Sequence, residues 1–245
     1  MSCYGPLAAW YDALTGDVPY EQFADFYEAE FASDGGEFRL LLDFCCGTGT
    51  LTAIMARRGY EMIAADASVD MLMQAREKCA ELPVPPLFLL QDASELDLYG
   101  TVDAAYCSLD GLNYLPPDAL PELFRRLHLF IRPGGLLLFD IRTPDWLESL
   151  DGQVFVDEGE DLLCLWRADY DAGEGALVYG MDLFSREKKL WRRSREEHVE
   201  YAHAPETLEK LLTDAGFRDM VWRENVTDNA QGRLFLRCKR GKKEA

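Results

Sequence analysis

The sequence predicts an α/β protein built around a mainly parallel β-sheet. Between residues 39 and 141, short apolar runs alternate with longer amphipathic stretches, a pattern typical of repeated strand and helix units. The 245 residues are 48% hydrophobic, which fits one large domain or one domain with a small insertion. From about residue 142 to 203 apolar and polar residues alternate, which predicts an added antiparallel meander.

Turn signals divide the first region into five strands and the helices between them. The expected strands are the apolar runs at residues 39–45, 60–66, 87–92, 102–109 and 134–141. Gly59 is expected to end the first helix, and Ser68 is expected to cap the second. A further helix is expected after Pro116 and Pro117. The chain then closes with a helix at 205–215 and strands at 217–224 and 232–240.

The charge and the cysteines restrict the class of protein. With 25 Lys and Arg against 44 Asp and Glu, the formal net charge is −19, so the surface repels phosphate and a nucleic-acid partner is not expected. There is no signal-peptide pattern and no run near the roughly 18 apolar residues of a membrane span, so we expect a cytoplasmic protein without membrane contact. The seven cysteines contain no C-x-x-C pair and are expected to be reduced core thiols; no metal site is expected.

The sharpest chemical signal is the segment LLDFCCGTGTLT at residues 41–52. Asp43 ends the first strand, and a glycine-rich turn then leads into a helix, so the backbone can approach a ligand closely and helix N–H groups are free. A dinucleotide-binding turn requires G-x-G-x-x-G. Here Cys45 replaces the first glycine and Leu51 or Thr52 the third, which argues against a nicotinamide or flavin cofactor.

This segment resembles motif I of the class I S-adenosylmethionine (SAM) dependent methyltransferases, an acidic residue followed by x-G-x-G-x-G. The matching residues are Asp43, Cys45, Gly47, Thr48 and Gly49, and the departure is Cys45 for the first glycine. The resemblance implies that this loop passes under the methionine part of SAM and that Asp43 supports the site near the amino group. A carboxylate close to an ammonium and a sulfonium is electrostatically favourable where water is scarce.

The next two strand ends match the same family in order and spacing. By resemblance, Asp66 after the second strand accepts hydrogen bonds from both ribose hydroxyls, and Ala67 and Met71 lie near the adenine. Asp92 and Ala93 after the third strand are expected to contact the adenine edge and amino group. Together with motif I, this ordered set is far more specific than any one motif alone.

The loop after the fourth strand resembles motif IV, which lines the methyl-transfer site. Ser108 and Leu109 are expected to contact SAM. Position alone makes Asp110 a candidate proton acceptor or amine-orienting group, Asn113 a candidate substrate ligand and Tyr114 a third residue near transfer. A general base is not required, because orientation supplies on the order of 7 to 11 kcal/mol.

At the N-terminus, LAAWYDALTGDVPYEQF resembles the lid helix of bacterial small-molecule methyltransferases of this class. The resemblance implies that Tyr11, next to Asp12, covers SAM with Tyr20 nearby, and such a lid excludes water. It also implies a Rossmann-like seven-stranded sheet with helices on both faces, strand order 3-2-1-4-5-7-6 and an antiparallel last strand. The expected domains are lid helices at 1–38, a SAM-binding core at 39–141 and 204–245, and an antiparallel substrate cap inserted at 142–203.

The resemblance implies a SAM-dependent methyltransferase that transfers a methyl group to an N, O or C atom of a small molecule and releases S-adenosylhomocysteine (SAH). The alternatives are a non-catalytic module that binds SAM or SAH, which Cys45 slightly favours, and a methyltransferase acting on RNA or protein. An aminopropyltransferase of related fold is disfavoured because residues 102–114 lack paired acids in a polyamine context. Both a monomer and a homodimer are compatible with the sequence.

Several of these assignments have a purely structural alternative. Asp43 and Asp66 also suit capping of turns, and Tyr11 and Tyr20 also suit packing on a helix face. The segment REKKLWRRSR at residues 186–195 is a cationic strand in an anionic protein. Its inward residues are a candidate site for an anionic substrate, and the alternative is a solvated edge strand protected by its charge.

Overall fold

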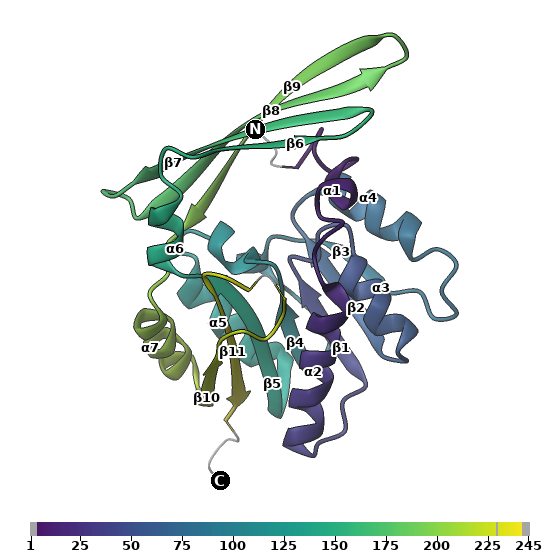
Figure 1. The fold of residues 1–245 in the computed structure, drawn as a ribbon. Coiled ribbons are helices and arrows are strands. Elements are labelled where there is room, and N and C mark those ends of the chain that lie inside the picture. Colours follow the sequence, from purple (N-terminus) through teal and green to yellow (C-terminus); the bar gives the residue numbers. More distant parts are fainter. Residues whose placement is uncertain (1–3, 229, 242–245) are drawn as a thin grey trace.

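The computed structural model describes residues 4–228 and 230–241, and the structural statements below refer to these ranges. It contains two β-sheets, one above the other in Figure 1. The larger has seven strands in the order β10-β11-β5-β4-β1-β2-β3, and the smaller has four in the order β6-β7-β8-β9. Because β10 and β11 are the sixth and seventh strands of the larger sheet, its order is the predicted 3-2-1-4-5-7-6, and the predicted fold class is confirmed.

Along the chain, the first five strands of the larger sheet alternate with helices. They are β1 (Leu40–Phe44), α3 (Thr50–Arg57), β2 (Glu61–Asp66), α4 (Val69–Lys78), β3 (Leu87–Leu90), η1 (Ala93–Glu95), β4 (Val102–Cys107), η2 (Gly111–Tyr114), α5 (Leu120–Phe130) and β5 (Ile131–Arg142). Strand β1 pairs in parallel with both β2 and β4, so their carboxyl ends meet at one edge of the sheet. This edge carries the loops that the sequence assigned to the cofactor.

The chain closes the sheet with α7 (Pro205–Ala215), β10 (Phe217–Arg223) and β11 (Arg233–Arg240). Strand β11 lies antiparallel to β5, as predicted for the last strand. Ser68 caps α4 by accepting a hydrogen bond from the Met71 N–H at 3.3 Å, and Gly216 ends α7 with a left-handed φ of 98°.

Alternating side chains on the strands bury the two faces of the sheet under different helices. On β1, Leu41 packs with residues of α3 and of α2 (Tyr20–Asp34), whereas Leu42 packs with residues of α5 and α7. None of the described helices has the length and apolarity needed to cross a membrane. Six of the seven cysteines are described and all six are free thiols; Cys3 lies outside the described residues.

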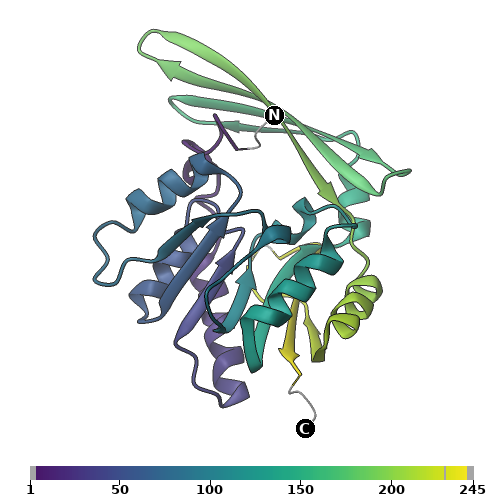
Figure 2. The ribbon, with the colours of Figure 1, turned by 180° about the vertical axis from the view of Figure 1, so that it is seen from behind.

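The smaller sheet is inserted between β5 and α7, after the short helix α6 (Pro144–Ser149). Its antiparallel strands are β6 (Val154–Glu158), β7 (Leu162–Asp171), β8 (Ala176–Glu187) and β9 (Leu190–Tyr201). It extends across the top of the core, above the helix α1 (Tyr11–Leu14), as both views show (Figures 1 and 2). Leu7 from the N-terminal segment packs with Cys164 and Met181 of this sheet, so the N-terminal residues join the two sheets.

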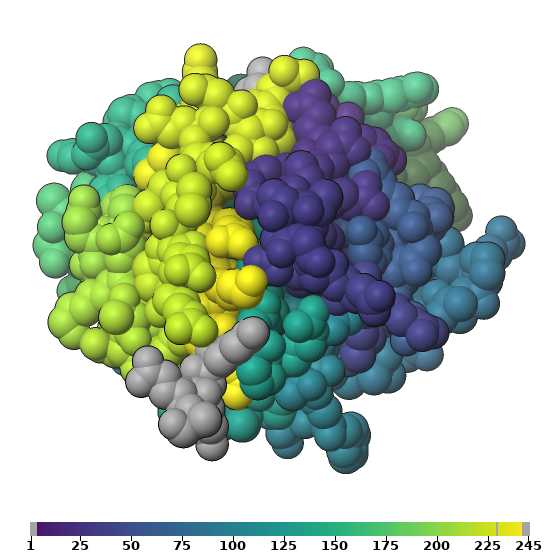
Figure 3. All heavy atoms as spheres, turned by 90° about the horizontal axis from the view of Figure 1, so that it is seen from below, coloured from purple at the N-terminus to yellow at the C-terminus, as the bar shows by residue number. Residues whose placement is uncertain are grey.

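Helix α2 fixes the N-terminal segment to the other end of the chain. Figure 3 shows the purple N-terminal region beside the yellow C-terminal strands. Glu30 pairs with Arg223 at 2.7 Å, and Asp34 pairs with Arg237 at 2.9 Å and with Lys239 at 2.6 Å. Helix α1 therefore precedes a helix that is anchored on the core.

Candidate active site

A cavity of about 420 Å³ lies at the carboxyl ends of the core strands. Its lining includes Tyr11, Tyr20, Asp43, Cys45, Gly47, Thr48, Asp66, Ala67, Met71, Asp92, Ala93, Ser108 and Leu109. These are all the residues that the sequence assigned to the cofactor except Gly49. The lining also contains Tyr114, from the three catalytic candidates, and Tyr4, which the sequence did not single out.

The glycine-rich turn keeps its shape although Cys45 stands where the family has glycine. Cys45 adopts a left-handed φ of 64°, a conformation that costs little only for glycine. A Cβ added to Gly111 would lie 3.1 Å from the Cys45 Cβ and 2.7 Å from the Cys107 Sγ, so Gly111 leaves room for the cysteine side chain. The departure from motif I is therefore accommodated by a second glycine in the loop after β4.

Gly49 does not line the cavity but lies where helix α4 packs against the glycine-rich turn. It has a left-handed φ of 70°, and a Cβ there would lie only 2.8 Å from the Cβ of Ala75 on α4. The absence of a side chain lets α4 pack directly against the turn. Gly49 therefore brings the second helix of the core close to the first strand end.

Asp43 presents a buried carboxyl group to the cavity. The Thr52 hydroxyl donates a hydrogen bond to its Oδ2 at 2.5 Å. Burial raises the pKa of Asp43 to about 7, and this hydrogen bond opposes the rise. The described lining contains no Lys, Arg or His, so the cavity itself offers Asp43 no positive partner. A buried carboxyl of this kind fits a cationic ligand.

Asp66 and Asp92 hold the next two loops in place. Asp66 accepts hydrogen bonds from the backbone N–H groups of Gly47 and Ser68, both at 2.8 Å, which ties the β1 and β2 loops together. Burial raises the pKa of Asp66 above its usual range. Asp92 accepts from the Ser94 N–H at 2.8 Å and starts the turn η1. With Asp43, three aspartates face a cavity whose described lining carries no basic residue.

Helix α1, which holds the residues predicted to form a lid, is fastened to the glycine-rich turn by a group that we call the lid latch, consisting of Asp12, Thr48 and Lys78. The Thr48 hydroxyl donates to Asp12 Oδ1 at 2.6 Å, and Lys78 Nζ lies 2.8 Å from Asp12 Oδ2. Lys78 also donates to Thr48 at 3.1 Å. Tyr11 of the same short helix lines the cavity, so the latch holds it there. Lys78 was not predicted from the sequence as a site residue, because it lies 30 residues from Thr48 along the chain.

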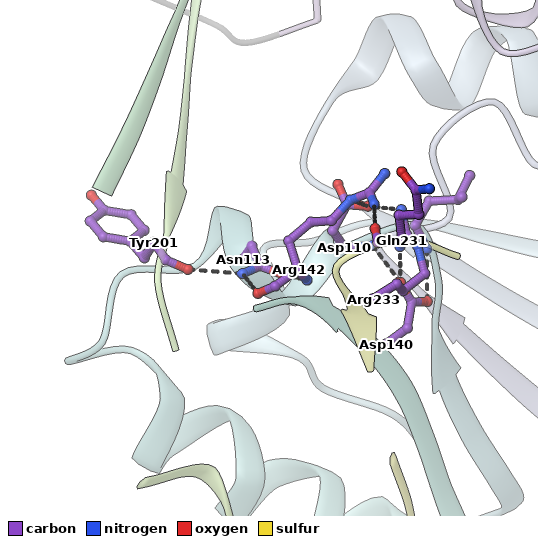
Figure 4. Close-up of polar contacts among 8 residues, drawn as sticks. Asp110, Asn113, Asp140, Arg142, Tyr201, Gln231 and Arg233 are labelled. Carbon is purple, nitrogen blue, oxygen red and sulfur yellow. Dashed lines mark hydrogen bonds and ion pairs between the residues drawn. The ribbon is translucent and has the colours of Figure 1, made fainter. Parts of the chain in front are cut away.

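The loop after β4 is held in an unusual conformation by a buried ion network. Leu109 and Asp110 have left-handed φ values of 54° and 53°. Asp140 of β5 accepts hydrogen bonds from both of their N–H groups at 2.9 Å, and Arg233 of β11 bonds to Asp140 and to Asp110 (Figure 4). Asp110 also lies 3.6 Å from Arg142. The carboxylate of Asp110 is thus engaged in this network and lies outside the cavity lining.

Asn113 is fully buried and its amide joins the core to the smaller sheet. Its Nδ2 donates to the Tyr201 carbonyl at 2.9 Å and the Arg142 carbonyl at 3.2 Å, and its Oδ1 accepts from the Arg142 N–H at 3.0 Å (Figure 4). These contacts engage both the nitrogen and the oxygen of the side-chain amide, and Asn113 does not line the cavity. The structure thus brings Tyr114, alone of the three catalytic candidates, to the cavity and gives Asp110 and Asn113 contacts that hold the loop.

Aromatic rings gather at the end of the cavity under the smaller sheet. We call this group the aromatic cluster; its members are Tyr4, Tyr11, Tyr114 and His198. The Tyr4 ring lies 5.9 Å from Tyr11, 5.7 Å from Tyr114 and 4.5 Å from His198, measured between centroids. Glu196 on β9 accepts a hydrogen bond from the Tyr4 N–H at 2.9 Å and so holds the N-terminal segment in place. Glu196 and His198, beyond the cationic segment, were not predicted from the sequence as site residues.

The cationic segment at 186–195 is not one strand as predicted: it forms the end of β8, a turn and the start of β9, and it does not reach the cavity lining. Arg193 and Arg195 lie 2.6 and 3.1 Å from Asp182, a buried carboxylate on the neighbouring strand β8, and Arg167 of β7 lies 2.8 Å from it. These arginines compensate a charge within the smaller sheet. Across the described part of the chain, no group of three or more His, Cys, Asp or Glu side chains is arranged to hold a metal ion.

The seven-stranded sheet with its glycine-rich turn and three acidic strand ends defines a class I SAM-dependent methyltransferase, and the chain belongs to this family. The profile of a methyltransferase domain matches residues 41–135. The putative methyltransferase YqeM of Bacillus subtilis (strain 168) is 30% identical over 246 residues, covering 98% of each chain.

Solved structures agree with this assignment. A SAM-dependent methyltransferase from Clostridium acetobutylicum ATCC 824 has a TM-score of 0.87 at 26% identity, covering 98% of this chain and 100% of that one. The SAM-bound amino pentose methyltransferase CalS10 from Micromonospora echinaspora has a TM-score of 0.77 at 19% identity, covering 95% and 96%, and shares the fold. Family membership and the SAM-dependent methyltransferase from Clostridium acetobutylicum make SAM the cofactor, and an acidic cavity without basic residues in its described lining fits its positive sulfonium and ammonium groups.

Proposed function

We propose that the protein transfers a methyl group from SAM to an N, O or C atom of a small molecule. The observation that carries this proposal is the cavity of about 420 Å³, which lies beneath the lid residues and the aromatic cluster. The cofactor occupies part of this volume, so the space left at Tyr4 and Tyr114 suits a small acceptor. An RNA acceptor is disfavoured by the net charge of −19 and by the lack of basic residues in the described lining.

In this proposal the protein acts mainly by orientation and by excluding water. When bound, SAM supplies an electrophilic methyl group on a positively charged sulfur. The lid latch holds Tyr11 over the cavity, and the network of Asp140 and Arg233 fixes the backbone of the loop after β4. We further propose that the insertion at 142–203 serves as the substrate cap, because its strand β9 holds Tyr4 against the cavity.

Titration calorimetry followed by a turnover assay tests this proposal. The protein is first titrated with SAM and with SAH, and then incubated with SAM and one of three fractions: ultrafiltered small metabolites, RNA or protein. We expect SAM binding and SAH formation only with the small metabolites. Binding without turnover in every fraction would support the non-catalytic module, turnover only with RNA or protein would contradict the small-molecule acceptor, and absence of binding would refute both the enzyme and the module.

A further inference from the structure

Strand β9 carries a buried carboxyl group, that of Glu200, which the sequence did not single out. Glu196, His198 and Glu200 occupy alternate positions of β9, so their side chains leave the same face of the smaller sheet. Glu200 is only 5% exposed. Its neighbours come from several elements: Asp110 after β4, Tyr114 in η2, Arg142 at the end of β5, Tyr179 in β8 and Arg233 in β11.

The charges around Glu200 do not balance. Three carboxylates, Asp110, Asp140 and Glu200, share the two guanidinium groups of Arg142 and Arg233. Arg233 binds Asp140 and Asp110 directly, which leaves Glu200 with weaker attraction to either arginine. If all three carboxylates were ionised, one negative charge would be in excess, so Glu200 keeps its proton at neutral pH unless a cation binds nearby. Consistent with this, burial and Asp110 raise the pKa of Glu200 to about 8.

Tyr114 connects this carboxyl group to the cavity. Its hydroxyl lies close enough to the Glu200 carboxyl group to lower the pKa of that group, its ring lies 5.7 Å from the Tyr4 ring, and both tyrosines line the cavity. Burial raises the pKa values of both phenols well above the usual range, so they stay neutral. Neutral aromatic rings backed by a carboxylate form a favourable site for an organic cation.

We infer that the methyl acceptor is an amine, bound in its ammonium form against Tyr4 and Tyr114, and that Glu200 acts through Tyr114 as the positioning residue that selects it. The inference rests on the proposed function and narrows the acceptor atom to nitrogen. An anionic acceptor, the candidate suggested by the cationic segment at 186–195, would meet three aspartates and no basic residue in the described lining. A neutral alcohol would not stabilise the ionised form of Glu200, so the carboxyl group gives it no advantage.

The same arrangement accounts for the proton that an ammonium group must lose before nitrogen can react. The proton passes from the ammonium to the Tyr114 oxygen while the Tyr114 proton passes to Glu200, which leaves a neutral amine and a neutral carboxyl group. The amine lone pair then forms the nitrogen–carbon bond as the carbon–sulfur bond breaks, and its electron pair stays on sulfur. The products are a methylated ammonium and SAH.

Choline and its uncharged isostere 3,3-dimethyl-1-butanol test the selection of a cation. SAH-loaded protein is titrated with each compound, and the prior SAH titration tests the proposed function separately. We expect choline to bind at least about tenfold more tightly than the alcohol. Equal binding of the two compounds, or no binding of choline to SAH-loaded protein, would overturn the inference while leaving the proposed function standing.

Variants of β9 test the role of Glu200 itself. Glu200→Gln is expected to weaken choline binding about tenfold without changing SAH binding, which also reports that the variant is folded. The matched control is Glu197→Gln, which removes the same charge from an exposed position of the same strand and leaves choline binding unchanged. Tyr114→Phe, which removes the connecting hydroxyl, is expected to weaken choline binding as well.

A pH profile separates charge selection from a merely structural role. In the wild type, choline affinity is expected to rise with pH through about 8, as Glu200 ionises. Asp43, whose pKa is about 7 in the free protein, gives up its proton when SAH binds and contributes equally in the wild type and in Glu200→Gln. We expect the step near pH 8 to disappear in Glu200→Gln and to remain in Glu197→Gln; identical profiles for the wild type and Glu200→Gln would refute the role of Glu200.

Discussion

Replacing Asp43 by Asn is expected to change how the affinity for SAH depends on pH. Burial raises the pKa of Asp43 to about 7, so in the free protein this carboxyl keeps its proton up to neutral pH. The ammonium group of SAH favours the ionised carboxylate, and binding therefore expels the proton. The affinity is expected to rise as the pH increases toward 7 and to level off above it.

The size of this effect follows from the pKa. One unit below it, about one molecule in ten carries an ionised Asp43, so wild-type affinity at pH 6 is expected to be about tenfold weaker than at pH 8. Asp43→Asn removes this contribution and is expected to bind about tenfold more weakly than the wild type at pH 8, with a flatter profile. Asp66, whose pKa is also raised by burial, accounts for the slope that remains.

Titration calorimetry with SAH across this pH range measures both quantities. The control variant is Glu95→Gln, which removes a carboxylate at an exposed position outside the cavity lining and is expected to match the wild type. Superimposable profiles for the wild type and Asp43→Asn would refute the electrostatic role assigned to Asp43.

Three further predictions concern the groups that shape the site. Arg233→Met leaves Asp140 buried without its main counter-ion, so urea denaturation should show a loss of about 3–5 kcal/mol in the free energy of unfolding; a wild-type value would contradict the network. Gly49→Ala should destabilise the protein by about 1–3 kcal/mol more than Gly152→Ala, because both glycines have a φ of +70° but only Gly49 lacks room for a Cβ; equal losses would contradict this packing argument. Lys78→Met breaks the lid latch and should weaken SAH binding about tenfold by calorimetry, whereas unchanged affinity would show that the latch does not support the cofactor.

The sequence predicted the strand ends well because local patterns determine them. Asp43, Asp66 and Asp92 each lie at the end of an apolar run or just after it, and parallel strands bring such ends to one edge of the sheet. The smaller sheet was predicted from its alternation, but β6 was missed. All five residues of β6 are exposed, so burial imposes no pattern on them. Helix α6 was also missed, although Thr143 followed by Pro144 is a recognisable start.

The ion network around the loop after β4 could not be predicted from the sequence, because its members lie far apart along the chain. Arg233 lies 93 residues from Asp140 and 123 from Asp110, and no local pattern predicts such a network. Position in the chain suggested catalytic roles for Asp110 and Asn113, but the left-handed turn at Leu109 and Asp110 places both outside the cavity lining. Cys45 is a similar case, because its compatibility with the turn depends on Gly111, far along the chain.

A crystal structure of the protein with SAH tests the central claim most directly. The account predicts electron density for SAH in the cavity, with its ribose at Asp66, its amino group near Asp43 and its sulfur facing the space beside Tyr4 and Tyr114. Density that places the ribose away from Asp66, or a cavity that stays empty at saturating SAH while the protein remains folded, would contradict the account.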